Sequence, residues 1–212
     1  VLTHEIMNSI TPITSLSDTM LAMNEEIPTD IKEGLQVISS TGKGLISFVE
    51  SYRKFTHVPT PKPSLFYVNQ FVERVIQLAQ YHHPSSNIEF KTDIKPDDLI
   101  LFADENLVNQ VVLNLLKNAM QAIGTQQSDR WILIKAYCDP DENVIMEISN
   151  NGPLITPEEA EHIFIPFFTT KENGSGIGLS LSRQIMRVSG GSLNLKNPSS
   201  SAYTTFILTF PA

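Results

Sequence analysis

Apolar residues recur at helical spacing over the first 55 residues and divide this stretch into two predicted helices. The helices cover residues 1–24 and 30–55, because apolar side chains return every three or four positions in both. Pro28, in the segment between them, favours a turn, so the pair is predicted to form a hairpin. Since one hairpin cannot bury the apolar stripes of both helices, we expect two copies to associate as a homodimeric four-helix bundle. The stripes contain Leu2, Ile6, Ile10, Ile13, Leu16 and Met20, then Ile31, Leu35, Ile38, Leu45, Phe48 or Val49, Tyr52 and Phe55, with Gly42 at one apolar position of the second.

A proline-rich segment separates the predicted hairpin from the rest of the chain. Pro59, Pro61 and Pro63 remove backbone donors and favour an extended conformation, which is typical of a semi-rigid linker. We therefore place a helical domain at residues 1–57, a linker at 58–64 and a second domain at 65–212. The mixed order of strands and helices in the second domain predicts an α+β protein: the hairpin followed by an open α/β sandwich. Strands are predicted at 65–68, 88–92, 99–102, 131–138, 144–149, 193–195 and 204–210, and helices at 70–80, 105–123 and 177–188.

The composition describes a folded, acidic chain. Hydrophobic residues make up 41% of the 212 residues, and the formal net charge is −8 at pH 7. An acidic surface lacks the basic face that nucleic acid requires, so we expect no nucleic-acid partner. No run reaches the ~18 apolar residues that a membrane helix needs, so we expect no direct membrane contact by this part of the protein. The single cysteine fits a reducing compartment, and Val1 stands within a helical pattern. We therefore expect a cytoplasmic piece of a longer protein, whose other parts could be anchored in a membrane.

Residues 174–179 read Gly-Ser-Gly-Ile-Gly-Leu and come directly before a predicted helix. Glycines let backbone amides approach a phosphate chain closely, and a helix N-terminus offers free N–H groups. The spacing differs from the Rossmann fingerprint and from the Walker A loop, which ends in Gly-Lys-Ser/Thr. A plain flexible loop would explain these glycines equally well, so this segment alone does not decide the function.

Asn114 and Asn118 lie one turn apart in the strongly apolar helix predicted at 105–123. Two amides on one face of such a helix are costly unless they meet a polar partner. They can be a satisfied pair in the core, or they can present oxygens to phosphate-bound Mg²⁺, which prefers oxygen ligands. Two further segments, residues 150–153 (Asn-Asn-Gly-Pro) and 164–171 (Phe-Ile-Pro-Phe-Phe-Thr-Thr-Lys), could each be an ordinary turn.

Taken in order, these four segments resemble the N, G1, F and G2 boxes of the histidine-kinase catalytic domain. That domain belongs to the ATPase superfamily shared with gyrase, Hsp90 and MutL, and the resemblance covers about residues 65–212. It implies an open α/β sandwich that binds ATP and Mg²⁺ between the long helix and a lid near residues 171–175. The implied nucleotide-binding residues are Asn114, Lys117, Asn118, Asn150, Gly152, Thr170, Lys171, Gly174, Ser175, Gly176, Ile177, Gly178 and Leu179, with Asn118 and Asn114 also serving the metal.

The first predicted helix contains a further motif, in which His4 lies opposite the apolar stripe. A lone exposed histidine is usually only a surface residue, but Glu5 follows directly and Asn8 lies one turn on. The motif resembles the H box of the same family's dimerisation domain, and most closely the NtrB/NtrY-like pattern. The resemblance implies a two-component sensor histidine kinase that phosphorylates itself on His4, with Glu5 and Asn8 as further catalytic residues. It also implies a partner, the receiver domain of a response regulator, which takes the group on an aspartate.

Some positions depart from the family pattern. Met7 replaces a basic residue and Ser9 replaces a proline, while Asn150 replaces the aspartate that binds the adenine amino group and Leu154 replaces a glycine. Asn150 and Leu154 imply weak ATP binding, and together with Met7 they leave a second reading, a nucleotide-binding pseudokinase scaffold. A third reading is a hydrolytic ATPase of the same fold. Those enzymes carry glutamate where Asn114 stands, and an amide cannot act as the base that activates water, so the kinase is favoured.

Overall fold

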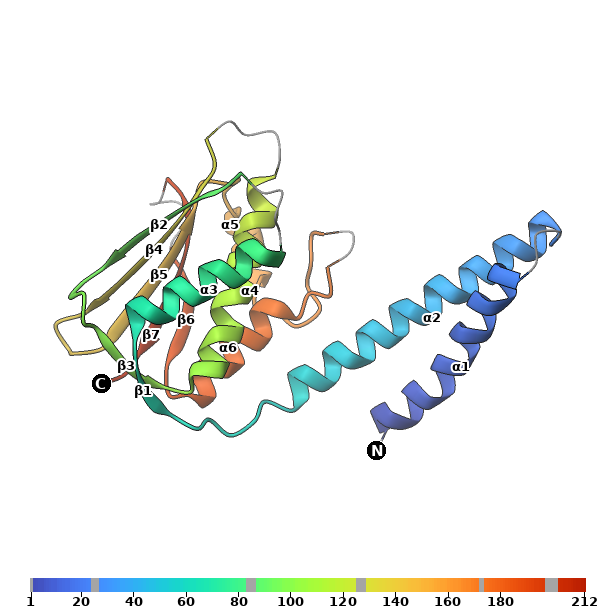
Figure 1. The fold of residues 1–212 in the computed structure, drawn as a ribbon, viewed down its shortest axis with the longest axis horizontal. Coiled ribbons are helices and arrows are strands. Elements are labelled where there is room, and N and C mark those ends of the chain that lie inside the picture. The colour runs from blue at the N-terminus through green and yellow to red at the C-terminus, as the bar shows by residue number, and fades with distance from the viewer. Residues whose placement is uncertain (1, 24–26, 83–86, 125–128, 172–173, 197–201) are drawn as a thin grey trace.

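The fold consists of a long helical hairpin and an α/β sandwich joined by an extended segment (Figure 1). The computed structural model describes residues 2–23, 27–82, 87–124, 129–171, 174–196 and 202–212. Helices α1 (Leu2–Met23) and α2 (Thr29–Thr56) run antiparallel, and the hairpin extends away from the sandwich. The predicted α+β architecture, a hairpin followed by a sandwich, is confirmed.

Small polar residues are buried along the contact between α1 and α2. Thr14, Ser17 and Ser39 are all buried. Ser39 Oγ donates a hydrogen bond across the hairpin to Asp18 Oδ1 at 2.5 Å. Gly42 lets the two helices approach closely, because a Cβ atom at this position would overlap Thr14 Oγ1. The glycine that interrupts the apolar stripe of α2 therefore serves the contact within the hairpin.

Much of each apolar stripe of the hairpin faces outward. Ile13, Leu16 and Met20 of α1 are 56%, 61% and 46% exposed, and Ile38 and Leu45 of α2 are also exposed. One hairpin thus leaves much of its stripes uncovered, as their pattern predicts. None of the described helices is both long and apolar enough to cross a membrane.

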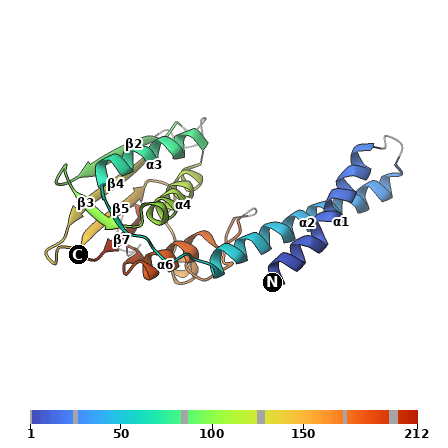
Figure 2. The ribbon, with the colours of Figure 1, turned by 60° about the horizontal axis from the view of Figure 1, so that its bottom comes forward.

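The sandwich is built on a five-stranded sheet, and helices cover one face of this sheet, as both ribbon views show (Figures 1 and 2). The strand order is β2–β4–β5–β7–β6; β2 and β4 are parallel, and the other neighbours are antiparallel. Strands β1 and β3 form a separate antiparallel pair. The strands are β1 (Ser64–Tyr67), β2 (Glu89–Ile94), β3 (Ile100–Ala103), β4 (Trp131–Cys138), β5 (Val144–Asn150), β6 (Ser192–Leu195) and β7 (Thr204–Phe210); the helices are α3 (Val68–His82), α4 (Glu105–Ile123) and α6 (Gly178–Val188).

Helix α4 lies at the centre of the sandwich because one of its faces is apolar throughout. Val111 and Leu116 on that face have no exposed surface and belong to the main core. The N-terminus of the helix is fixed by Asp104, whose Oδ1 accepts hydrogen bonds from the backbone N–H groups of Asn106 and Leu107. The helix is thereby held in the position that presents its polar residues to the loops beyond β5.

A short helix, α5 (Pro157–His162), was not predicted from the apolar pattern. It has no buried residue, so no apolar periodicity marks it. Thr156 Oγ1 accepts from Glu159 N at 3.1 Å, while Glu159 Oε2 accepts from Thr156 N at 2.9 Å. This reciprocal capping, with Pro157 in the first turn, explains why the segment is helical.

The hairpin contacts the sandwich through side chains of α2 and the linker. Phe55 and Val58 pack against the sandwich core. Nearer the middle of α2, the ring of Phe48 stacks on the ring of Phe167, with centroids 5.0 Å apart and an interplanar angle of 28°. Since Phe167 lies in the segment that resembles the F box, this stack joins the hairpin directly to the edge of the candidate site.

Candidate functional site

Helix α4 presents polar side chains along the side that faces α6 and the loop before it. Asn114, Lys117, Asn118 and Gln121 follow one another at i, i+3, i+4 and i+7, so they share one side of the helix. Asn114 is half-buried, and its Nδ2 donates to Ser182 Oγ of α6 at 3.0 Å. Gln121 was not among the predicted site residues, although its helical spacing from Asn114 and Asn118 could have identified it.

Glycines bring the loop before α6 against α4 and against the segment at 164–171. A Cβ atom at Gly178, the first residue of α6, would overlap Asn114 Oδ1. Gly176 has a φ of +66°, which glycine adopts without strain, and a Cβ atom there would overlap the backbone of Phe167. Phe167 N also donates to the Gly176 carbonyl oxygen at 3.0 Å. The two segments that resemble the F and G2 boxes therefore lie directly against each other.

Lys171 connects the end of the 164–171 segment to α4. Its Nζ donates to Asn118 Oδ1 at 3.1 Å and to Gln121 Oε1 at 2.7 Å. Burial of the ammonium group, and to a lesser extent the positive charge of Lys117, lowers the pKa of Lys171. Two amide oxygens thus converge on one cation, a donor set that also suits Mg²⁺. The described part of the chain contains no group of three His, Cys, Asp or Glu residues able to hold a metal ion.

The first turn of α6 has no side-chain cap. Ile177, at the N-cap position, is buried and offers no hydrogen bond to the turn. The hydroxyl of Ser180 donates instead to the Ile177 carbonyl oxygen at 2.9 Å. An uncapped helix N-terminus combines free N–H groups with partial positive charge, which favours a phosphate. The other predicted binding residues of this region lie in the 164–171 segment, in the loop before α6 and in the first turn of α6. Thr170 and Ser175 are exposed, and Gly174 and Leu179 are half-buried.

Asn150 and Gly152 lie where β5 ends, near the C-terminal end of α4. Asn150 is 3% exposed, and its Nδ2 is buried without a hydrogen-bond partner among the described residues. A Cβ atom at Gly152 would lie 2.9 Å from this Nδ2 and 3.0 Å from backbone atoms of Ala122 and Ile123. Gly152 therefore allows β5 and α4 to meet closely beside an unpaired buried amide. An orphaned polar group at this place fits a site that is completed by a ligand.

The predicted catalytic residues of the first helix lie in α1. Glu5 and Asn8 are exposed, while the side chain of His4 lies outside the described part of the structure. The helix continues from Leu2 to Met23 with Pro12 inside it. In both ribbon views the N-terminal end of α1 lies apart from α4 and α6 (Figures 1 and 2). The structure therefore gathers the residues of the four sandwich segments but does not bring them to the residues of α1.

Residues 103–212 match the family described as histidine kinase-, DNA gyrase B-, and HSP90-like ATPase. The signal transduction histidine-protein kinase AtoS of Escherichia coli is 28% identical over 207 residues, which cover 97% of this chain and 33% of AtoS. The sensory histidine kinase/phosphatase NtrB of Rhizobium leguminosarum bv. phaseoli is 26% identical over 223 residues, which cover 100% of this chain and 57% of NtrB. The chain thus spans about a third of the length of relatives such as AtoS.

Solved structures of the histidine kinase ThkA share the fold. Its catalytic domain alone is 32% identical, with a TM-score of 0.62 over 71% of this chain and 95% of that one. ThkA in complex with the response regulator protein TrrA is 27% identical, with a TM-score of 0.68 over 99% of this chain and 59% of that one. The second structure therefore matches both the hairpin and the sandwich.

Proposed function

The chain belongs to the histidine kinase-, DNA gyrase B- and HSP90-like ATPase family, and on that basis we propose that it is the core of a sensor histidine kinase, which transfers the γ-phosphoryl group of ATP to its own His4. One observation carries the proposal: Lys171 and the amides of α4 converge beside the uncapped N-terminus of α6. Positive charge, amide oxygens and free N–H groups thereby meet where a triphosphate and its metal would be held. Relatives named as histidine kinases over nearly the whole chain favour the kinase within the family.

In this proposal the residues of the sandwich act by positioning and charge neutralisation, which is how proteins catalyse phosphoryl transfer. Asn118, with Asn114 beside it, presents side-chain oxygens to Mg²⁺ or to its bound waters. Lys171 and the backbone N–H groups around Gly176 and Gly178 hold the β- and γ-phosphates. Mg²⁺, when bound, offsets the negative charge of the transferred group.

His4 is the proposed acceptor because it begins the segment that resembles the H box. The neutral Nε2 attacks the γ-phosphorus in line, so that a nitrogen–phosphorus bond forms as the bond to the ADP oxygen breaks. Glu5 accepts the Nδ1 proton, or orients the ring, as the imidazole becomes cationic. Because the N-terminal end of α1 lies apart from α4 and α6 in both views, transfer requires the sandwich to move relative to the hairpin or to serve the other chain of a dimer.

The proposed partner is the receiver domain of a response regulator, which takes the phosphoryl group on an aspartate. The similarity to ThkA in complex with the response regulator TrrA supports a partner of this kind. We assign to Asn8 a role in the reverse reaction, in which its exposed amide orients a water toward the regulator's phospho-aspartate. The name of the relative NtrB, a histidine kinase/phosphatase, is consistent with a core that has both activities.

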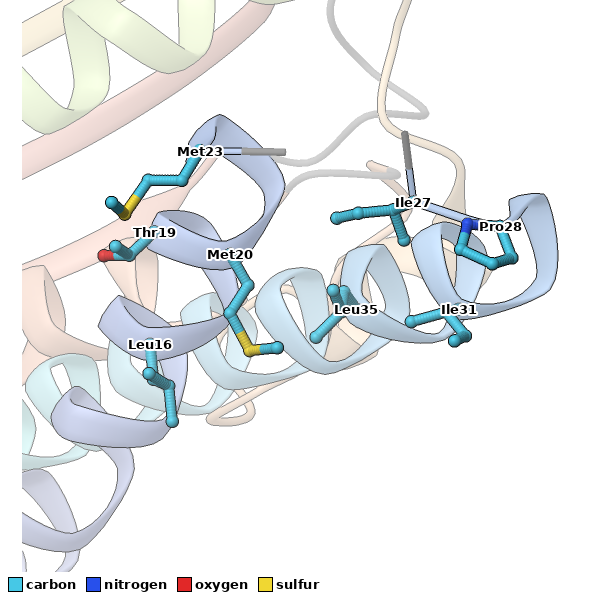
Figure 3. Close-up of a pocket in the computed structure, with 8 residues that line it drawn as sticks. All are labelled: Leu16, Thr19, Met20, Met23, Ile27, Pro28, Ile31 and Leu35. Atoms are coloured by element: carbon cyan, nitrogen blue, oxygen red, sulfur yellow. The ribbon is translucent and has the colours of Figure 1, made fainter. Parts of the chain in front are cut away.

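The proposed second subunit would cover the outward-facing stripes of the hairpin. An apolar hollow of about 450 Å³ opens between α1 and α2 at the closed end of the hairpin, and its lining residues are drawn in Figure 3. Two hairpins facing each other would bury this hollow and the stripes in a four-helix bundle. The hollow is lined by Leu16, Thr19, Met20, Met23, Ile27, Pro28, Ile31 and Leu35.

Radiolabelled ATP tests the proposal directly. The chain should acquire a covalent label that survives base and is lost in acid, as phosphohistidine is, and the His4→Gln variant should stay unlabelled while still binding ADP. A label that persists in this variant would show that His4 is not the acceptor. Nucleotide binding without any label would favour the pseudokinase scaffold, and release of labelled phosphate without labelled protein would favour the hydrolytic ATPase.

A further inference from the structure

We infer that Asn150 relaxes the selectivity of the nucleotide site at position 6 of a purine, so that 6-oxopurine nucleotides bind about as well as adenine nucleotides. The inference rests on the proposed function and on the family resemblance, which implies that residue 150 contacts the base. It goes beyond that function by naming a second class of nucleotide that the site accepts.

The side-chain amide of Asn150 is buried but not anchored. Its backbone is fixed at the end of β5, where it pairs with Ile132 of β4 and Thr204 of β7. Its side-chain Nδ2 is inaccessible to solvent and has no partner in the part of the chain that the structure describes. A buried amide is unfavourable unless a hydrogen-bonding group meets it, so this side chain would gain a hydrogen bond from a ligand that reached it.

The neighbouring Asn151 shows what an anchored amide looks like at the same strand end. Its Oδ1 accepts from Trp131 N, and its Nδ2 donates to the Asp129 carbonyl oxygen, both at 2.9 Å. Reversing this amide would turn its Nδ2 toward the Trp131 N–H and its Oδ1 toward the Asp129 carbonyl oxygen, so that donor would face donor and acceptor would face acceptor. No described hydrogen bond sets the orientation of the Asn150 amide in this way, so a half-turn about its last side-chain bond can exchange Oδ1 and Nδ2.

This freedom matters because the two kinds of purine present opposite patterns. Adenine offers a donor at its 6-amino group and an acceptor at N1, whereas hypoxanthine offers an acceptor at its 6-oxo group and a donor at N1. An amide carries one donor and one acceptor, so Asn150 can match either base after a half-turn. An ionised aspartate, the residue that the family pattern has here, only accepts hydrogen bonds. Where it faces position 6 it pairs with the amino group of adenine and repels a 6-oxo group, and it can accept from the N1–H of hypoxanthine only if the base shifts. Selectivity for adenine is therefore expected of an aspartate at this position but not of Asn150.

Binding of ADP and IDP to the whole chain in the presence of Mg²⁺, measured by calorimetry, tests the inference without any phosphoryl transfer. The dissociation constants of the two nucleotides should agree within about three-fold, since either base can pair with the amide. The Asn150→Asp variant should bind ADP about five-fold more tightly and IDP at least about ten-fold more weakly. The Asn150→Ala variant should bind both nucleotides more weakly while their ratio stays within about three-fold, because it removes the donor and the acceptor together.

The outcomes separate this inference from the proposed function. Preference of the unaltered chain for ADP by ten-fold or more would overturn the relaxed selectivity and leave the nucleotide site intact. Failure of both nucleotides to bind would overturn the site itself. The comparison in the unaltered chain decides the question even where Asn150→Asp fails to fold, and equal binding of ADP and IDP by a folded Asn150→Asp variant would show that residue 150 does not read the base.

Discussion

Replacing Asp104 with alanine should destabilise the sandwich by about 2 kcal/mol, because this one carboxylate accepts hydrogen bonds from three backbone N–H groups. Its Oδ1 caps α4 through Asn106 N at 3.0 Å and Leu107 N at 3.2 Å. Its Oδ2 accepts from Lys62 N of the linker at 2.8 Å. Asp104 therefore holds both the start of the helix that carries Asn114 and the end of the linker that leads from the hairpin.

The magnitude follows from these contacts. Loss of an N-cap residue costs about 1 kcal/mol, and loss of the bond from the exposed Lys62 N–H costs about another 1 kcal/mol. A total of about 2 kcal/mol corresponds to a fall of about 4–8 °C in the melting temperature for a chain of this length. Asp104→Asn keeps an acceptor for the cap but loses the negative charge beside the helix N-terminus, and its Nδ2 cannot accept the hydrogen bond from Lys62 N, so it should cost about 1–2 kcal/mol.

The stabilisation by Asp104 should also depend on pH, and it should decrease as the pH is lowered. The Lys62 N–H, and after it the Leu107 and Asn106 N–H groups, lower the pKa of Asp104 because they donate to the ionised carboxylate, and they outweigh the opposing effect of partial burial. A carboxyl group whose folded-state pKa is lowered stabilises the fold above its unfolded pKa of about 3.9, and this stabilisation is lost as the pH falls through the folded-state value. The difference between the unaltered chain and Asp104→Asn should therefore be constant above about pH 5 and shrink below about pH 4.

Urea unfolding monitored by the fluorescence of Trp131 measures this effect, because the only tryptophan of the chain lies in β4 and reports on the sandwich. Asp98→Ala is the matched control: Asp98 is exposed, takes part in no described hydrogen bond or ion pair, and its loss removes the same charge. We expect this control to change the stability by less than about 0.5 kcal/mol. Equal midpoints for Asp104→Ala and Asp98→Ala would refute the assignment of Asp104 as the cap and linker anchor.

Three further changes test the hairpin and the site. Gly42→Ala should destabilise the hairpin by about 1–3 kcal/mol, because its Cβ overlaps Thr14 Oγ1, and adding Thr14→Ala should restore most of the loss in circular-dichroism melts; an unaffected single variant would contradict the close helix approach. Gly178→Ala should weaken ADP binding at least about ten-fold in calorimetry while the Trp131 unfolding midpoint changes little, because the new Cβ displaces Asn114; unchanged affinity would place Asn114 outside the nucleotide site. Asn8→Ala should reduce dephosphorylation of the regulator about ten-fold and spare autophosphorylation, whereas equal loss of both would indicate damage to α1.

The elements predicted best from the sequence are those in which buried and exposed side chains follow a regular pattern. Helix α4 begins and ends at the predicted residues because its nine buried positions repeat at helical spacing and Asp104 marks its start. Helix α3 begins at Val68, two residues earlier than predicted, since the strand before it ends sooner. Helix α5 was missed because it buries nothing, although its start at Thr156 carries a capping signature that does not depend on burial.

The contacts that define the candidate site lay beyond prediction for a different reason: they join residues that are far apart in sequence and are set by backbone approach. Motif order identified Asn118 and Lys171, but their hydrogen bond, and the participation of Gln121, depend on how the 164–171 segment turns back over α4. That turn requires Phe167 to adopt a φ of +68°, which a bulky residue rarely does and which no local pattern signals. The strained residue is held from two sides, by its backbone bond to Gly176 and by the stack of its ring on Phe48 of α2. Because both contacts meet at this one residue, the geometry around Lys171 depends on the hairpin as well as on the sandwich. A sequence read one domain at a time gives no sign of that dependence.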